Sequence, residues 1–136
     1  MRWGIAPALT VVLAIASLAT AALADHYEGS KGNGGVKSQI SLSNSEAGVY
    51  EGTVTSKEAP CRKQRRVKVY HDQNKNGLDR SDYRIGKDIT DKKGNYEVNG
   101  NQAPTGDNVI AVVAGKHLRD GTLCLGDDKT IAALSG

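Results

Sequence analysis

Apolar and polar residues alternate along several short stretches of the chain, and this period of two residues predicts β-strands. In residues 65–71 the alternation turns Val67 and Val69 inward and the residues between them outward. Residues 108–115 are apolar on both faces, which is typical of a strand in the middle of a packed sheet. The other predicted strands are 48–56, 84–90, a short strand at 95–98 after a turn at 91–94, and 129–134.

The spacing of these stretches predicts the fold class. Beyond residue 24 no convincing helical period is found, although the alanines of residues 129–134 leave a helix open there. Short strands separated by Gly, Asn, Asp and Pro turns, at intervals of about ten residues, are typical of β-sandwiches. We therefore expect an all-β protein, a single antiparallel sandwich with immunoglobulin-like layers and about seven strands.

The first 24 residues have the pattern of a signal peptide. Arg2 gives a positive start, residues 5–23 are uncharged and largely apolar, and Ala22 and Ala24 form the small-x-small pattern of a cleavage site. This pattern predicts a secreted or cell-surface protein without a membrane span after cleavage. The alternative is an uncleaved anchor, since about twenty apolar residues can cross a bilayer.

The remaining chain divides by composition into two parts. Residues 25–47 are rich in Gly, Ser, Asn and charged residues, which predicts a flexible leader with a weak strand at 36–42. Residues 48–136 form the predicted sandwich domain. Loss of Arg2 with the signal lowers the net charge from +3 to +2, so the exported chain is close to neutral.

The two cysteines, Cys61 and Cys124, predict one disulfide in an exported chain. The chain has no phenylalanine, and its single tryptophan lies in the signal segment, so the core is built from aliphatic residues and tyrosine. Such a small core is commonly reinforced by a staple. In the loop-entropy model, a disulfide closing a loop of this length contributes roughly 4 kcal/mol.

Three short motifs carry a resemblance to a known family. GTV at 52–54, VKVY at 67–70 and TD-x-x-G-x-Y at 90–96 resemble the carboxypeptidase-regulatory-like, or transthyretin-like, β-sandwich modules of secreted and surface proteins. The resemblance covers roughly residues 49–134. It implies a sandwich of about seven strands that acts as a binding or spacer module without catalysis.

A loop between two predicted strands has the spacing D-x-N-x-N-G. Asp72, Asn74 and Asn76 supply an oxygen at every second residue, and Gly77 permits the turn that points the carbonyl of Leu78 inward. Mixed carboxylate, amide and carbonyl oxygens are the ligands that calcium prefers. The sequence therefore predicts a calcium site in this loop.

The second half of the loop departs from the EF-hand pattern. Position twelve, which should be an acid, is Tyr83, and the acids Asp79 and Asp82 each come one residue early. The loop resembles the calcium loops of bacterial adhesin repeat domains, which lie between two strands. On this resemblance Asp82 is the closing ligand, and Asp79 binds directly or through water.

A plain loop is the alternative, because Asp, Asn and Gly are also the best turn formers. Lys75 and Arg80 offset two of the three negative charges of the loop acids, so the loop carries a net charge of about −1. Any affinity for calcium is then expected at the weak, extracellular end, roughly 10⁻⁴ to 10⁻³ M.

A basic cluster in residues 61–68 supports a second hypothesis, a polyanion- or glycan-binding protein. The alternative is the solvated face of an edge strand, where Lys and Arg oppose aggregation. Few aromatic residues are available for stacking, so no nucleic acid partner is expected. The cluster consists of Arg62, Lys63, Arg65, Arg66 and Lys68.

No nucleophile stands in a catalytic motif, and His26, His71 and His117 are scattered, so we do not expect an enzyme. His71, beside Asp72, suits a pocket residue or a partly buried structural histidine. The favoured function is a secreted, non-catalytic module, calcium-stabilised, with a structural or adhesive role and an unknown extracellular partner. Polyanion binding is second, and a hydrolase or hydrolase inhibitor is third.

Overall fold

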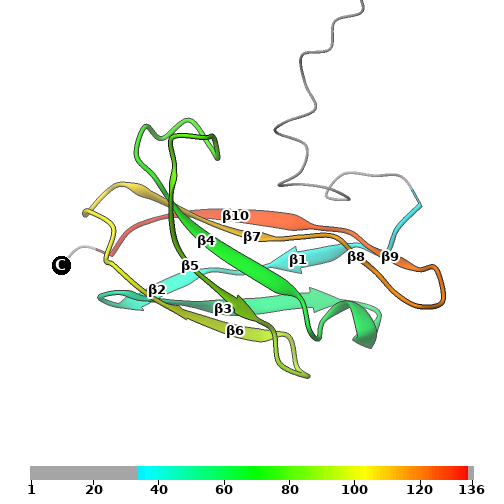
Figure 1. Cartoon of the computed structure of the whole chain (residues 1–136). Coiled ribbons are helices and arrows are strands. Elements are labelled where there is room, and N and C mark those ends of the chain that lie inside the picture. Colours follow the sequence, from blue (N-terminus) through cyan, green and yellow to red (C-terminus); the bar gives the residue numbers. More distant parts are fainter. Residues whose placement is uncertain (1–33, 135–136) are drawn as a thin grey trace, which may run out of the picture.

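The computed structural model describes residues 34–134, which form an all-β sandwich of two antiparallel layers (Figure 1). The predicted signal peptide and the first part of the predicted leader lie outside the described residues. The ten strands are β1 (Ser38–Ile40), β2 (Ser43–Glu46), β3 (Val49–Ser56), β4 (Arg66–Asp72), β5 (Tyr83–Ile89), β6 (Asn95–Asn99), β7 (Asn108–Val113), β8 (Lys116–His117), β9 (Leu123–Cys124) and β10 (Asp127–Ala132), with one 3₁₀ turn, η1 (Ala59–Cys61).

One layer is built around β3. The chain through β1 and β2 pairs along one edge of β3, and β6 pairs with the other edge. The second layer has the order β10-β7-β4-β5, with every neighbouring pair antiparallel. A small hairpin of β8 and β9 lies beyond the end of β7 (Figure 1). Each strand predicted from the alternation is present, so the predicted all-β fold class is confirmed. The strands number ten and not about seven, because the short strands β1, β2, β8 and β9 add to the six predicted from alternation.

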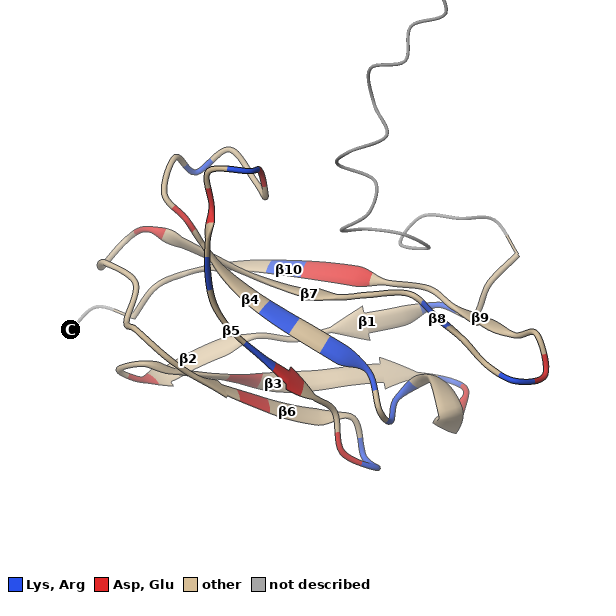
Figure 2. Ribbon diagram, in the orientation of Figure 1, with Lys and Arg blue, Asp and Glu red and all other residues tan. Residues whose placement is uncertain are grey.

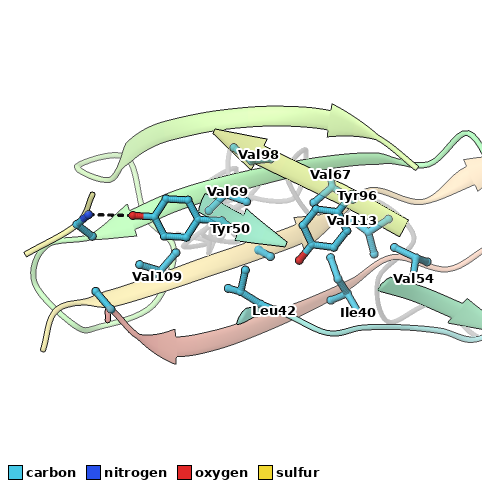
Figure 3. Close-up of a cluster of buried hydrophobic side chains, with 13 residues drawn as sticks. Ile40, Leu42, Tyr50, Val54, Val67, Val69, Tyr96, Val98, Val109 and Val113 are labelled. Carbon is cyan, nitrogen blue, oxygen red and sulfur yellow. Dashed lines mark hydrogen bonds between the residues drawn. The ribbon is translucent and has the colours of Figure 1, made fainter. Parts of the chain in front are cut away.

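The core lies between the two layers (Figure 3). Tyr50 and Val54 of β3 face Val67 and Val69 of β4, and all four side chains are fully buried. The hydroxyl of Tyr50 accepts a hydrogen bond from the backbone N–H of Ala103 at 2.9 Å, so its polar end is satisfied inside the core. Fully burying a valine contributes about 1.5–3 kcal/mol, which makes these alternating positions the main source of stability.

The sandwich begins earlier than the sequence predicts. β1 and β2 fall inside the range 25–47, which is polar in composition and was expected to be a flexible leader. Ile40 and Leu42 of this stretch belong to the buried core, so the predicted domain start at residue 48 is wrong. Composition misses these strands because only two apolar residues mark them, and the edge of β3 supplies their hydrogen bonds. The predicted weak strand at 36–42 corresponds to β1.

The predicted disulfide is confirmed. Cys61 of η1 and Cys124 of β9 are bonded, with their Cα atoms 5.4 Å apart, and both residues are fully buried. The bond ties two segments separated by 63 residues. It therefore closes the end of the sandwich near the β8–β9 hairpin.

The motif TD-x-x-G-x-Y has a structural role in the turn between β5 and β6. The carboxylate of Asp91 accepts the backbone N–H of Asn95 at 2.9 Å. Gly94 has a φ of +92°, and a Cβ there would lie 2.2 Å from the carbonyl oxygen of Val54. The buried Tyr96 donates its hydroxyl to a carbonyl between β1 and β2 at 2.6 Å. These residues fix a tight turn and join β6 to the connection between β1 and β2 within the first layer.

Candidate metal-binding loop

The loop predicted to bind calcium joins β4 to β5 and projects beyond the end of the sandwich (Figure 1). Asp72 is the last residue of β4, and Tyr83 is the first residue of β5. Because His71 pairs with Tyr83 in the antiparallel ladder, Asp72 and Asp82 both lie at the base of the loop. Strand pairing thus brings together two acids that are ten positions apart in the sequence.

Asp72 is a buried carboxylate with an unsatisfied oxygen. Its side chain is 0% exposed, and its Oδ2 accepts the backbone N–H of Gly77 at 3.0 Å. Its Oδ1 is buried and has no hydrogen-bond partner. A buried charged oxygen without a partner is unfavourable, and most such groups in proteins are paired or bind a metal. Asp72 therefore has the environment expected of a metal ligand.

Asp82 has the same feature on the other side of the loop. Its Oδ2 accepts the backbone N–H of Asp79 at 2.6 Å, and its Oδ1 is buried without a partner. Burial raises the pKa of Asp82, the backbone N–H groups of Asp79 and Gln73 oppose this shift, and the nearby negative charges of Asp79 and Asp72 add to it. The loop thus concentrates negative charge at a desolvated position.

The positive residues of the loop do not neutralise this charge. Lys75 and Arg80 are both exposed. Among residues 34–134 the one ion pair is between His71 and Asp107, and it includes neither cation of the loop. The carboxylates of the loop therefore have no cationic partner within the described part of the protein.

The outer part of the loop contains three further predicted ligands. Hydrogen bonds from Ser81, from Asn74 and from Asn76 hold the pKa of Asp79 well below its usual range. The Ser81 hydroxyl donates at 2.6 Å and the Asn74 Nδ2 at 3.0 Å. Asn74 and Asn76 are exposed, and the Oδ1 of Asn74 accepts the backbone N–H of Asn76 at 3.4 Å, so metal binding would exchange these hydrogen bonds for contacts to the ion. The structure places these three residues together on the solvent side of the loop.

Leu78 anchors the loop to the sheet. Its half-buried side chain packs against Tyr70 of β4 and Ile110 and Val112 of β7, on the outer face of the second layer. The spacing of the loop predicts a role for the carbonyl of Leu78 and does not predict this side-chain contact. The available signal was that Leu78 is the one aliphatic residue between Asp72 and Tyr83.

Carboxylates and imidazoles alone do not make a complete site here. In residues 34–134 no group of three or more His, Cys, Asp or Glu side chains is arranged to hold a metal ion. Calcium, however, takes six to eight oxygens and accepts amide, carbonyl and water ligands. Buried, unsatisfied carboxylate oxygens on Asp72 and on the half-buried Asp82, next to two asparagines, fit calcium better than zinc, which prefers Cys and His.

His71, at the base of the loop, contacts the connection that leads from β6 into β7. Its Nε2 lies 2.7 Å from Oδ2 of Asp107, the residue before β7. The imidazole is mostly buried, which fits the structural role considered from the sequence. This contact holds the ends of β4 and β7 together beside Asp72.

The basic cluster predicted from the sequence does not form one surface. Arg65 is fully buried and donates hydrogen bonds to the carbonyls of Cys61 at 2.6 Å and Ala114 at 2.7 Å. Its inclusion as a polyanion contact is therefore wrong, because alternation along β4 turns it inward. The exposed members of the cluster are Lys63 and Arg66, whereas Arg62 and Lys68 are half-buried.

Comparisons with known proteins identify no relative, since no protein-family model, curated protein or solved structure matches this chain. The resemblance to carboxypeptidase-regulatory-like modules therefore stays a prediction. No helix long and apolar enough to span a bilayer is found between residues 34 and 134. The disulfide between Cys61 and Cys124 is consistent with an extracytoplasmic location.

Proposed function

We propose that the protein is a secreted, non-catalytic β-sandwich module whose loop at residues 72–82 binds calcium. The observation that carries this proposal is the pair of buried, unpartnered carboxylate oxygens on Asp72 and Asp82. Two desolvated carboxylates repel each other, and a divalent cation between them removes both penalties at once.

In this proposal calcium joins the ends of two neighbouring strands. Asp72 at the end of β4 and Asp82 before β5 supply the inner ligands. Asp79, Asn74 and Asn76 close the outer side, together with the carbonyl of Leu78 and water. The ion then stiffens the tip of the sandwich, a role suited to a structural or adhesive module at a cell surface or in the medium. The extracellular partner stays undefined.

A calcium titration on the exported chain, with its disulfide intact, tests the proposal. The melting temperature is expected to rise with calcium and to fall when a chelator is added. At a calcium concentration tenfold above Kd, binding contributes about 1.4 kcal/mol, which corresponds to a rise of roughly 5–10 °C for a domain of this size. The transition is followed by circular dichroism.

The variant Asp72→Asn makes the test specific. It removes one uncompensated buried charge, so in chelator it is expected to be more stable than the natural protein by about 1–3 kcal/mol. In calcium it is expected to show no rise in melting temperature.

Asp128→Asn is the matched control, because Asp128 is an exposed acid on β10, and its calcium response should be unchanged. The proposal fails if calcium does not change the melting temperature of the natural protein and Asp72→Asn is less stable than the natural protein in chelator. The loop would then be an ordinary turn.

A further inference from the structure

The outer face of the second layer collects cations from two neighbouring strands. Lys68 alternates with the core residues of β4, so it projects away from the core, and it pairs directly with Lys87 of β5. Arg66 lies two residues before Lys68 on the same side, and Arg84 pairs with Tyr70 at the next outward position. We call Arg66, Lys68, Arg84 and Lys87 the cationic face.

The fold does not neutralise the cationic face. Within the described residues none of its four side chains has a hydrogen bond to another group or an ion pair. Lys68 and Lys87 stand directly opposite each other, and like charges in such cross-strand pairs oppose folding. Cations on β5, the edge strand of this layer, also oppose edge-to-edge aggregation, but Lys68 on the inner strand β4 has no such role, so the arrangement points to an external anionic partner.

The acids of strands β10 and β5 are separated from Lys68, and the loop acids Asp79 and Asp82 lie beyond Arg84 at the end of the cationic face. Figure 2 shows the basic bands on β4 and the acidic segment on β10, the strand at the opposite edge of the same layer. Across the ladder Lys68 pairs with Val112, which pairs with Asp128, so about 10 Å lies between the two charged positions. Asp88 of β5 turns to the first layer instead, where it accepts a backbone N–H of β6 at 2.9 Å.

The shape and chemistry of the cationic face favour one class of partner. The aromatic ring beside the cationic face, that of Tyr70, is only 8% exposed, so it offers no surface on which nucleic acid bases can stack. The one large exposed apolar side chain of the cationic face is Ile89, which is too little to insert into a membrane. A strand surface with four cations on two neighbouring strands fits an extended polymer with closely spaced anions.

We propose that the cationic face binds an anionic polysaccharide through its sulfate or carboxylate groups. Arg66 and Arg84 suit bidentate contacts to these groups, and Lys68 and Lys87 supply charge between them. The sequence alone suggested a different set, in which only Arg66 and Lys68 belong to this surface. The proposal does not depend on calcium, because its residues lie outside the loop at 73–82.

Retention on immobilised heparin, a sulfated polysaccharide, tests this inference in chelator and in calcium. The double variant Lys68→Gln, Lys87→Gln is expected to bind at least tenfold more weakly than the natural protein. The dependence of log K on log salt concentration should flatten by about two, since each neutralised anion releases about one counterion. The double variant Lys68→Arg, Lys87→Arg should retain binding.

Lys92→Gln with Lys93→Gln is the matched control, because it removes the same charge from the exposed turn before β6. Its affinity for heparin should change by less than about threefold. An equal loss in this control would reduce the effect to net charge and overturn the proposal. The proposal also fails if heparin does not retain the natural protein at low salt, or if duplex DNA or anionic phospholipid vesicles compete better than free heparin.

Discussion

Arg65 and Asp72 are buried charged residues of opposite sign, and they differ in how far hydrogen bonds satisfy them. The guanidinium of Arg65 donates four hydrogen bonds, two of them to the carbonyl of Leu125 at 2.9 Å and the hydroxyl of Ser38 at 2.9 Å. Burial lowers its pKa to about 10, so it remains charged at neutral pH. Asp72 accepts one hydrogen bond and keeps one oxygen unpartnered. One buried atom of Arg65, its Nε, also lacks a partner, but four hydrogen bonds satisfy the rest of its guanidinium, whereas Asp72 has only one.

At the same scale, Asp91 is expected to make stability depend on pH. The backbone N–H of Asn95 is the main cause that lowers the pKa of Asp91, with a further bond from Lys93. Because the folded pKa lies below the unfolded value of about 3.9, this contribution is complete above pH 4. It is lost as the pH falls through the folded pKa. Asp91→Asn should therefore lower the melting temperature at pH 7, and the difference should shrink below about pH 4.

Melting curves of the natural protein and the variant between pH 2 and pH 7 measure this effect. Asp128→Asn, on an exposed position of β10, is the control. A difference between Asp91→Asn and the natural protein that stays constant with pH would contradict the role of the charge.

Among the elements, Arg65 connects segments that share no ladder. Its four acceptors belong to β1, to η1, to the residue after β7 and to the residue after β9. The same region contains the disulfide between η1 and β9. One buried side chain thus joins both layers at the end opposite the candidate calcium loop (Figure 1).

Replacing this side chain is expected to destabilise the fold strongly. Arg65→Met keeps the apolar stem but leaves several buried acceptors without a donor, and each costs about 1 kcal/mol or more. We expect a loss of about 3–5 kcal/mol, measured by urea denaturation. Arg66→Met, on the exposed neighbouring position, should change stability by no more than about 0.5 kcal/mol. Similar losses of stability in the two variants would contradict the role of Arg65 in joining the two layers.

For the whole molecule, the two layers are held at one edge by polar contacts and at one end by the disulfide. The Oδ2 of Asp127 on β10 accepts the N–H of Ile40 on β1 at 2.9 Å, which links the layers where no ladder runs between them. The disulfide then limits the unfolded chain across 63 residues. Both features compensate for a core made mainly of valine and alanine.

Removal of the disulfide by Cys61→Ala with Cys124→Ala is expected to lower the free energy of unfolding by roughly 4 kcal/mol. Urea denaturation of this variant and of the oxidised natural protein gives the difference. If calcium binds the loop at 72–82, the calcium-induced rise in stability should be the same in both, because the loop and the disulfide lie at opposite ends (Figure 1). An unchanged midpoint would show that packing alone holds this end.

The sequence allowed much of the fold to be predicted, because alternation and turn chemistry are local. The spans of β3, β4, β6 and β7 follow from side chains that repeat every second residue. β1 was predicted only as a weak strand and β2 was not predicted, because a strand with so few apolar residues gains its hydrogen bonds only from a neighbour far along the chain.

For the candidate site too, some features follow from the sequence and others only from the tertiary structure. The sequence by itself determined which oxygen-bearing residues the loop contains and that Cys61 and Cys124 can pair. Only the tertiary structure decided that Asp72 is buried and near Asp82, that Arg65 is internal, and that Lys87 stands beside Lys68. Burial and register depend on which strands meet, and that choice is made by the free energy of the whole sandwich instead of by any single segment.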